Sequence, residues 1–207
     1  VSLGAIWEGA RFLGTKEVLL STYLLDFGVM SFGFFRPLMP VLAFDVYDAG
    51  EVGLGLLTAA PAIGSVLGSV ALLAIGDPNR KGIVVIVAYL AYAFGLVALG
   101  LSPWFWLALG VLVFLGLMDV ISFTVRQALI QLVAPDQYRG RAGSFSTILA
   151  GVGNSTGSAE MGALSGIVGA PVALVINGFI GVGITASAVL KWGALWRYDQ
   201  RNEVAED

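Results

Sequence analysis

The chain of 207 residues has no cysteine and no histidine, and only 12% of its residues are charged. Without cysteine it can form no disulfide and no thiolate metal site. Without histidine it lacks the commonest metal ligand and the side chain that ordinarily titrates near neutral pH. Any proton chemistry must therefore use carboxylates.

Several motifs are also missing from the sequence. It has no phosphate-cradling P-loop, no GxSxG nucleophile elbow and no HExxH zinc motif. It lacks the basic density that nucleic-acid binding requires, and no charged segment followed by an A-x-A site indicates a signal peptide. We therefore expect no enzymatic activity, no cofactor, no metal and no nucleic-acid partner.

What the chain does contain is apolar sequence. Hydrophobic residues make up 57% of it, and the mean hydropathy is +0.88. Ordinary soluble domains carry about 25% charged residues, twice the fraction found here. This composition predicts an all-α integral membrane protein that spans the bilayer several times.

Apolar runs separated by polar turns predict six transmembrane helices. Pro37 and Pro40 should kink the first of them toward its far end. The domain organisation expected is an interfacial amphipathic helix or linker at 1–17, a bundle at 18–196 and a cytoplasmic tail at 197–207. The predicted spans are 18–46, 52–75, 83–101, 104–133, 142–168 and 171 to about 195.

The charges in the loops alternate from one side of the membrane to the other. One set of loops holds only acidic residues or none, including Asp45, Asp48 and Glu51. The positive-inside rule therefore places both termini in the cytoplasm. The other set, which includes both ends of the chain, holds Arg11, Lys16, Arg80, Lys81, Arg139, Arg141, Arg197 and Arg201.

The fourth span carries the sharpest candidate site residue. As a helix, 104–133 is ~45 Å long and crosses a bilayer. Asp119 lies near its middle, where a charged aspartate is disfavoured by about 2.5 kcal/mol or more. We expect Asp119 to line a cavity as a proton or cation site; the alternative is a structural hydrogen bond to a neighbouring helix.

The order of several segments resembles a known family. These segments are EGARFL at 8–13, FFRPLMPVLAFDVY at 34–47, GLGLLTAAPAIGSVLGS at 53–69 and QLVAPDQYRGRAGSFSTILAGVGNSTG at 131–157. Together they resemble exporters of the major facilitator superfamily, and more narrowly the branch of enterobactin exporters and macrolide-efflux proteins. The loop GDPNRKG at 76–82 departs from that family's basic loop, which usually carries more arginine.

The resemblance implies a fold and a function. The chain would be the C-terminal six-helix half of the family's fold, a 3+3 inverted repeat, in a bacterial inner membrane. It would export a drug or siderophore-like molecule by proton antiport and alternating access, together with a missing N-terminal half or a second copy. The alternative is a truncated, non-transporting subunit or scaffold of a larger complex.

The intramembrane polar residues are the candidates for a proton or substrate pathway: Asp26, Arg36, Asp119, Arg126, Gln127 and Glu160. Arg126 and Gln127 would recognise an anionic group or form structural contacts. Asn154 is expected to hold helices together, and Tyr89, Tyr92 and Phe123 to be interfacial or to stack on an aromatic substrate. The loop residues Arg80, Lys81, Arg139 and Arg141 would neutralise helix ends or act as cytoplasmic gates.

Depth in the membrane predicts two ion pairs. Counted from the cytoplasmic ends of their spans, Arg36 and Glu160 both lie ~27 Å deep. By the same count Asp26 and Arg126 lie at ~12 Å. We therefore expect Arg36 to pair with Glu160 and Asp26 to pair with Arg126.

Overall fold

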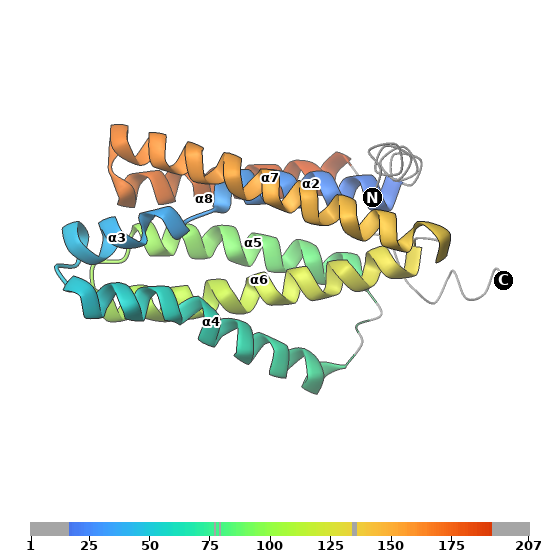
Figure 1. Cartoon of the computed structure of the whole chain (residues 1–207), viewed down its shortest axis with the longest axis horizontal. Helices are drawn as coiled ribbons and strands as arrows, with labels where there is room; N and C mark the ends of the chain where they lie inside the picture. Colours follow the sequence, from blue (N-terminus) through green and yellow to red (C-terminus); the bar gives the residue numbers. More distant parts are fainter. Residues whose placement is uncertain (1–16, 77, 79, 134–135, 192–207) are drawn as a thin grey trace.

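The computed structural model describes residues 17–191, except 77, 79 and 134–135, and every long element in this part of the chain is a helix (Figure 1). The segments expected to form the interfacial helix and the tail, 1–16 and 192–207, lie outside the described residues. The six long helices are α2 (Glu17–Gly33), α4 (Gly50–Ile75), α5 (Lys81–Gly100), α6 (Phe105–Val133), α7 (Asp136–Val168) and α8 (Ala170–Lys191).

The predicted all-helical membrane bundle is confirmed. Five segments of the described chain are long and apolar enough to cross a bilayer: Leu20–Val46, Gly50–Ile75, Lys81–Gly100, Phe105–Leu132 and Ala170–Lys191. The helix that fails this test is α7, which has 33 residues but is rich in glycine and serine. Its length is sufficient to span, at about 1.5 Å per residue, so its composition alone sets it apart.

The first predicted span is broken near its far end, as its prolines indicated. Helix α2 ends at Gly33, and Phe34 and Phe35 are not helical. A 3-10 turn η1 (Arg36–Leu38), a short helix α3 (Met39–Val41) and a π-helical turn η2 (Leu42–Val46) follow. Pro37 and Pro40 lack backbone N–H groups and cannot continue a regular helix. The break leaves Arg36 on an irregular segment between two helical ones.

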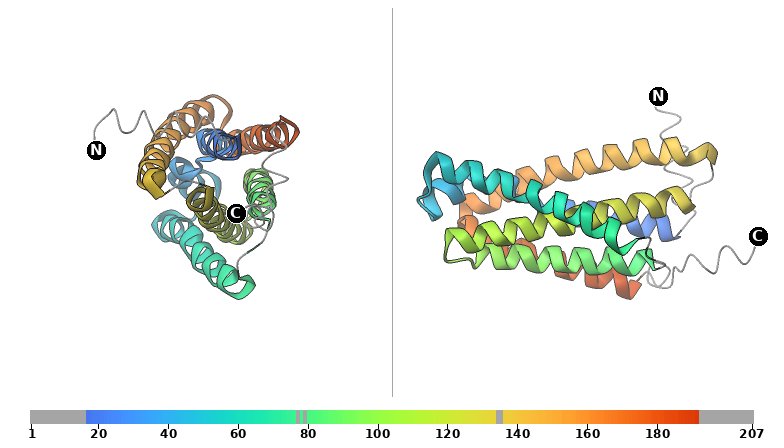
Figure 2. Two further views of the ribbon diagram at one scale, coloured as in Figure 1. Left: turned by 90° about the vertical axis from the view of Figure 1, so that its right-hand side faces the viewer. Right: turned by 90° about the horizontal axis from the view of Figure 1, so that it is seen from below.

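The six long helices form two groups of three. Helices α2, α7 and α8 lie together, and α4, α5 and α6 lie together (Figures 1 and 2). Helices α4 and α5 both pack on α6, and helices α7 and α8 both pack on α2. If α2, α4 and α5 are exchanged for α6, α7 and α8 in that order, these contacts are preserved. Because α2 and α6 run in opposite directions, the pattern is that of an inverted repeat.

Glycines allow two of these helix pairs to pack backbone against backbone. A Cβ atom added to Gly64 of α4 would meet the Val113 carbonyl of α6, and one added to Gly116 of α6 would meet the Pro61 carbonyl of α4. In the related pair, a Cβ on Gly157 of α7 would lie 2.5 Å from the Met30 carbonyl oxygen of α2. Small residues at such crossings allow close van der Waals packing in a lipid environment.

Gly116→Ala is expected to lower stability by about 1–3 kcal/mol, because its methyl group collides with backbone rather than with a movable side chain. Thermal unfolding of the purified protein in detergent measures the effect. Gly110→Ala, on the same helix with no atom within 4 Å of the added Cβ, is the control. Equal melting temperatures for the two variants would contradict the close crossing.

Candidate functional site

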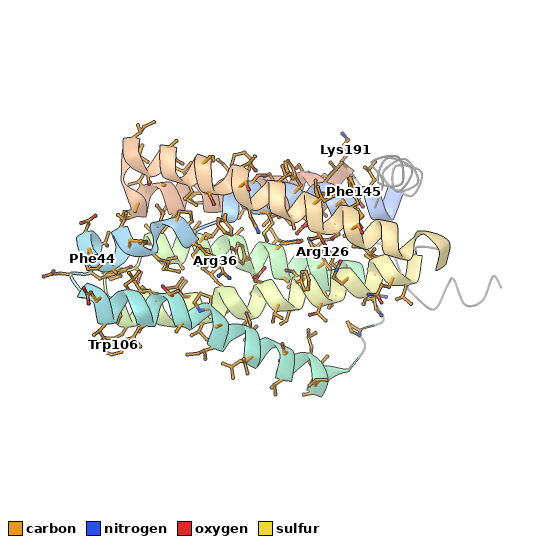
Figure 3. The ribbon with its side chains drawn as sticks, in the orientation of Figure 1. Arg36, Phe44, Trp106, Arg126, Phe145 and Lys191 are labelled. Carbon is orange, nitrogen blue, oxygen red and sulfur yellow. The ribbon has the colours of Figure 1, made fainter. Side chains whose placement is uncertain are left out.

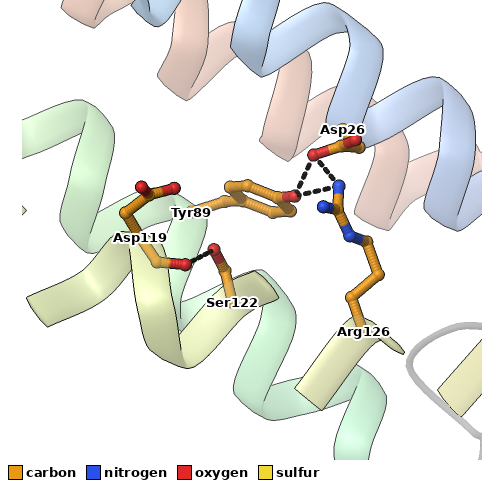
Figure 4. Close-up of polar contacts among 5 residues, drawn as sticks. All are labelled: Asp26, Tyr89, Asp119, Ser122 and Arg126. Atoms are coloured by element: carbon orange, nitrogen blue, oxygen red, sulfur yellow. Dashed lines mark hydrogen bonds and ion pairs between the residues drawn. The ribbon is translucent and has the colours of Figure 1, made fainter. Parts of the chain in front are cut away.

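A buried ion pair joins the two helix groups. Asp26 of α2 is 1% exposed and Arg126 of α6 is 4% exposed, and the Arg126 Nη1 contacts Asp26 Oδ1. The predicted Asp26–Arg126 pair is therefore confirmed. Tyr89 of α5 completes a triangle: its hydroxyl donates to Asp26 Oδ1 at 2.7 Å and accepts from Arg126 Nη1 at 3.1 Å (Figure 4).

The triangle neutralises two charges that lipid would penalise. A lone charge in a dry site costs several kcal/mol, whereas a paired and hydrogen-bonded one is tolerated. The Arg126 guanidinium also lies 5.7 Å from the centre of the Phe123 ring, within range of a cation–π contact. Three helices, α2, α5 and α6, are thereby linked at one point.

Beside this triangle lies a cavity of about 390 Å³, whose lining includes both members of the ion pair. Arg36, Asp119 and Asn154 also line it, so side chains from η1, α6 and α7 meet there. Figure 3 shows Arg36 and Arg126 between the upper and lower helices. The Asn154 Oδ1 atom is buried and has no hydrogen-bond partner among the described residues.

Asp119 differs from Asp26 in its partners. Within the described chain its carboxylate makes no hydrogen bond and no ion pair within 4 Å, and the Arg36 charge acts on it from a longer distance. The nearby Ser122 hydroxyl donates at 2.8 Å to the backbone carbonyl of Asp119, not to its carboxylate (Figure 4). The half-buried carboxylate of Asp119 is thus left facing the cavity.

The second predicted ion pair is wrong. In the described part of the chain Glu160 accepts a hydrogen bond from Asn177 Nδ2 of α8 at 2.7 Å, and Arg36 forms no ion pair with it. The depth count assumed a continuous first span, but α2 stops at Gly33 and the chain turns there. The turn directs Arg36 to the cavity, while Glu160 faces α8.

The other predicted residues lie apart from the cavity. The Gln127 Oε1 atom is buried without a partner among the described residues, and Gln127 is not part of the cavity lining. Arg80 precedes α5 and is exposed; Lys81 begins α5, is 1% exposed, and its Nζ donates to the Pro78 carbonyl at 3.3 Å. Arg139 and Arg141 lie on the first turns of α7, and their side chains are outside the described set.

Sequence reasoning missed the polar roles of two residues. It assigned Tyr89 to aromatic contacts, yet its hydroxyl bridges the buried ion pair. It did not single out Asn177, which is fully buried and holds Glu160. A polar group inside an apolar helix was the available signal, because such groups need partners in lipid.

Removing one member of the Asp26–Arg126 pair is expected to destabilise the protein more than removing both members. Asp26→Asn and Arg126→Gln should each cost about 3–5 kcal/mol, since each leaves one buried charge alone. The double variant should recover most of this loss, and Tyr89→Phe should cost about 1 kcal/mol. Thermal unfolding in detergent measures all four variants. A double variant as unstable as the worse single one would contradict a net role for the pair.

Comparison with known proteins shows the family to which the chain belongs. The chain is 25% identical over 198 residues to the enterobactin exporter EntS of Citrobacter koseri, covering 96% of this chain and 47% of that protein. It is 26% identical over 204 residues to EntS of Salmonella typhi, covering 98% and 49%. The chain thus spans about half the length of these relatives. Residues 20–204 match the Major Facilitator Superfamily, and the chain belongs to that family of membrane transporters.

Proposed function

We propose that the chain is one half of a secondary active exporter that moves a small molecule by proton antiport. The observation that carries the proposal is the cavity in which Asp119 has no direct partner within the described chain. Cavities of about 300–1,000 Å³ are typical of small-molecule sites, and this one falls within that range. An intramembrane carboxylate facing such a cavity is characteristic of proton and substrate pathways.

Asp119 is the proton carrier in this proposal. The Asp26 carboxylate is already engaged by Arg126 and Tyr89, so a proton carried there would have to displace these contacts. Asp119 has no such contact, and the chain offers no histidine to take its place. Proton uptake at Asp119 would change the net charge of the cavity by one unit and so alternate with substrate binding.

The second half of the transporter is proposed to be another six-helix unit, encoded with this chain or supplied by a second copy. The relatives are about twice as long as this chain, which supports the first source. Helix α7 presents Gly151, Gly162 and Gly166 on an exposed face with no atom within 4 Å of an added Cβ. Such a face suits close packing against another helix during alternating access.

The names of the relatives suggest the substrate class. They are named as enterobactin exporters, and we propose a siderophore-like or drug-like molecule for this chain, in a bacterial cytoplasmic membrane. The second candidate is a non-transporting subunit or scaffold of a larger complex. Sequencing the gene upstream discriminates them: six further spans in frame favour the transporter.

Both termini are proposed to lie in the cytoplasm. The cysteine-free chain allows a direct test, because Asp48→Cys and Asp136→Cys each introduce a single thiol. In intact cells an impermeant thiol reagent should label the cysteine at 48 and spare the one at 136. Labelling at 136 alone would reverse the orientation.

Asp119→Asn is expected to abolish uphill, proton-driven export while leaving exchange of substrate down its own gradient intact. The amide keeps the size and hydrogen bonding of the side chain but cannot take up a proton. Transport by the intact protein in proteoliposomes with an imposed pH gradient measures both activities.

The matched control for this test is Asp48→Asn, in a loop outside the cavity at a backbone φ of 48°, a conformation that asparagine tolerates. It should retain uphill export. Uphill export by Asp119→Asn with an unchanged pH profile would show Asp119 to be structural and would move the proton site to Glu160 or to the other half.

A further inference from the structure

A second cavity adjoins the central one. It has a volume of about 240 Å³ and is lined by Met39, Pro40, Leu54 and Thr58 together with Arg36 and Pro61. Arg36 and Pro61 also line the central cavity of about 390 Å³. The two spaces are therefore neighbours that share Arg36 and Pro61 in their walls. We call the smaller one the side cavity.

The two spaces differ in chemistry. The side cavity has one charged group, Arg36, and its other walls are apolar except for Thr58. The Thr58 hydroxyl is already used, since it donates to the Leu54 carbonyl at 2.8 Å. The central cavity instead holds four charged side chains, among them Arg36 itself. An apolar group suits the side cavity, and polar groups suit the central one.

Arg36 has donors available at the boundary. It is exposed, and within the described chain its guanidinium makes no hydrogen bond and no ion pair within 4 Å. A guanidinium carries five N–H donors, so an acceptor oxygen of a bound molecule can be held there without breaking an existing contact. Pro37 and the end of α2 at Gly33 fix the segment that presents it.

The charges of the central cavity favour a ligand without net charge. Arg126 neutralises Asp26, and the remaining Arg36 and Asp119 are of opposite sign. With Asp119 ionised the described lining carries no net charge, so a bound ion that pairs with Arg36 or Asp119 would leave the other of the two uncompensated in a low-dielectric site. A neutral or zwitterionic molecule avoids that cost.

We propose that the side cavity is a second compartment of the ligand site and binds the apolar arm of an elongated, electroneutral, amphipathic molecule. Arg36 holds a hydrogen-bond acceptor of this molecule at the boundary, and the polar remainder occupies the central cavity. At about 240 Å³ the side cavity alone falls below the usual size of a small-molecule site, which supports a shared one. The proposal rests on the transport function only in identifying the ligand as cargo.

A single thiol in the side cavity provides the test. Thr58→Cys in the purified, otherwise cysteine-free chain is alkylated with and without 6-propionyl-2-dimethylaminonaphthalene, an elongated neutral probe whose ketone oxygen is a hydrogen-bond acceptor. At a probe concentration ten times its dissociation constant, alkylation should slow about tenfold. Thr147→Cys, exposed on α7 and outside both cavities, is the matched control and should be alkylated at an unchanged rate.

Two further measurements test the effect of the charge of the probe and the contribution of Arg36. The anionic naphthalene dye 8-anilinonaphthalene-1-sulfonate, which also carries acceptor oxygens, should protect Thr58→Cys less than the neutral probe. Arg36→Gln should raise the neutral-probe concentration for half-protection about tenfold, as expected for loss of a hydrogen bond from a charged donor, whereas Arg36→Lys should retain most of the protection.

Equal slowing at Thr58→Cys and Thr147→Cys would show partition into detergent only and would overturn the proposal. So would stronger protection by the sulfonate, or protection that Arg36→Gln leaves unchanged. Because no proton gradient is used, failure here is distinct from failure of the transport function. A side cavity without protection and uphill export that depends on Asp119 would remove this proposal and leave the function standing.

Discussion

Charge inside a lipid-spanning bundle has to be neutralised, and the Asp26–Arg126 contact is where this chain meets that requirement. Both side chains are almost fully buried and come from different helix groups, and Tyr89 adds hydrogen bonds to each. The contact fixes α2 against α5 and α6 at one depth. It also determines what remains for function, because the cavity beside it keeps only Arg36 and Asp119 as charges without a close counter-ion in the described chain.

The helix crossings set the shape around that contact. Gly64 and Gly116 bring α4 and α6 together at the level of Pro61, and Gly157 does the same for α7 and α2. The C-terminal end of α4 diverges from α6 (Figure 1). The broken first span adds irregularity at one end of the cavity, and proline and π-helical turns of this kind are frequent at functional sites. Rigid crossings and one irregular segment thus border the same space.

The pattern of apolar runs separated by polar turns and the overall composition were sufficient to predict the helices. The turns Ser102–Pro103 and Gly169–Pro171 are local signals, and the span boundaries beside them fall close to the observed ones. The start of the fifth span was missed, since α7 begins at Asp136 rather than at 142, and the first span is broken after Gly33. Asp26 and Arg126 could be paired by depth because α6 is continuous and α2 stays helical beyond Asp26. Depth was not sufficient for Arg36 and Glu160, because Glu160 faces Asn177 of α8 while Arg36 lines the central cavity. Which way a side chain faces depends on tertiary packing. A polar group in an apolar helix indicates that Asn177 and the Tyr89 hydroxyl need partners, but it does not identify Glu160, Asp26 and Arg126 as those partners.

The central claim is that substrate and proton move in opposite directions through the same protein. The direct measurement uses proteoliposomes of the intact protein that enclose a pH-sensitive dye, with a substrate gradient as the only driving force. The account predicts that substrate leaving the vesicles draws protons in, so that the lumen acidifies, and that reversing the substrate gradient reverses the pH change. A lumen that stays at constant pH while substrate moves, or protons that travel in the same direction as substrate, would contradict it.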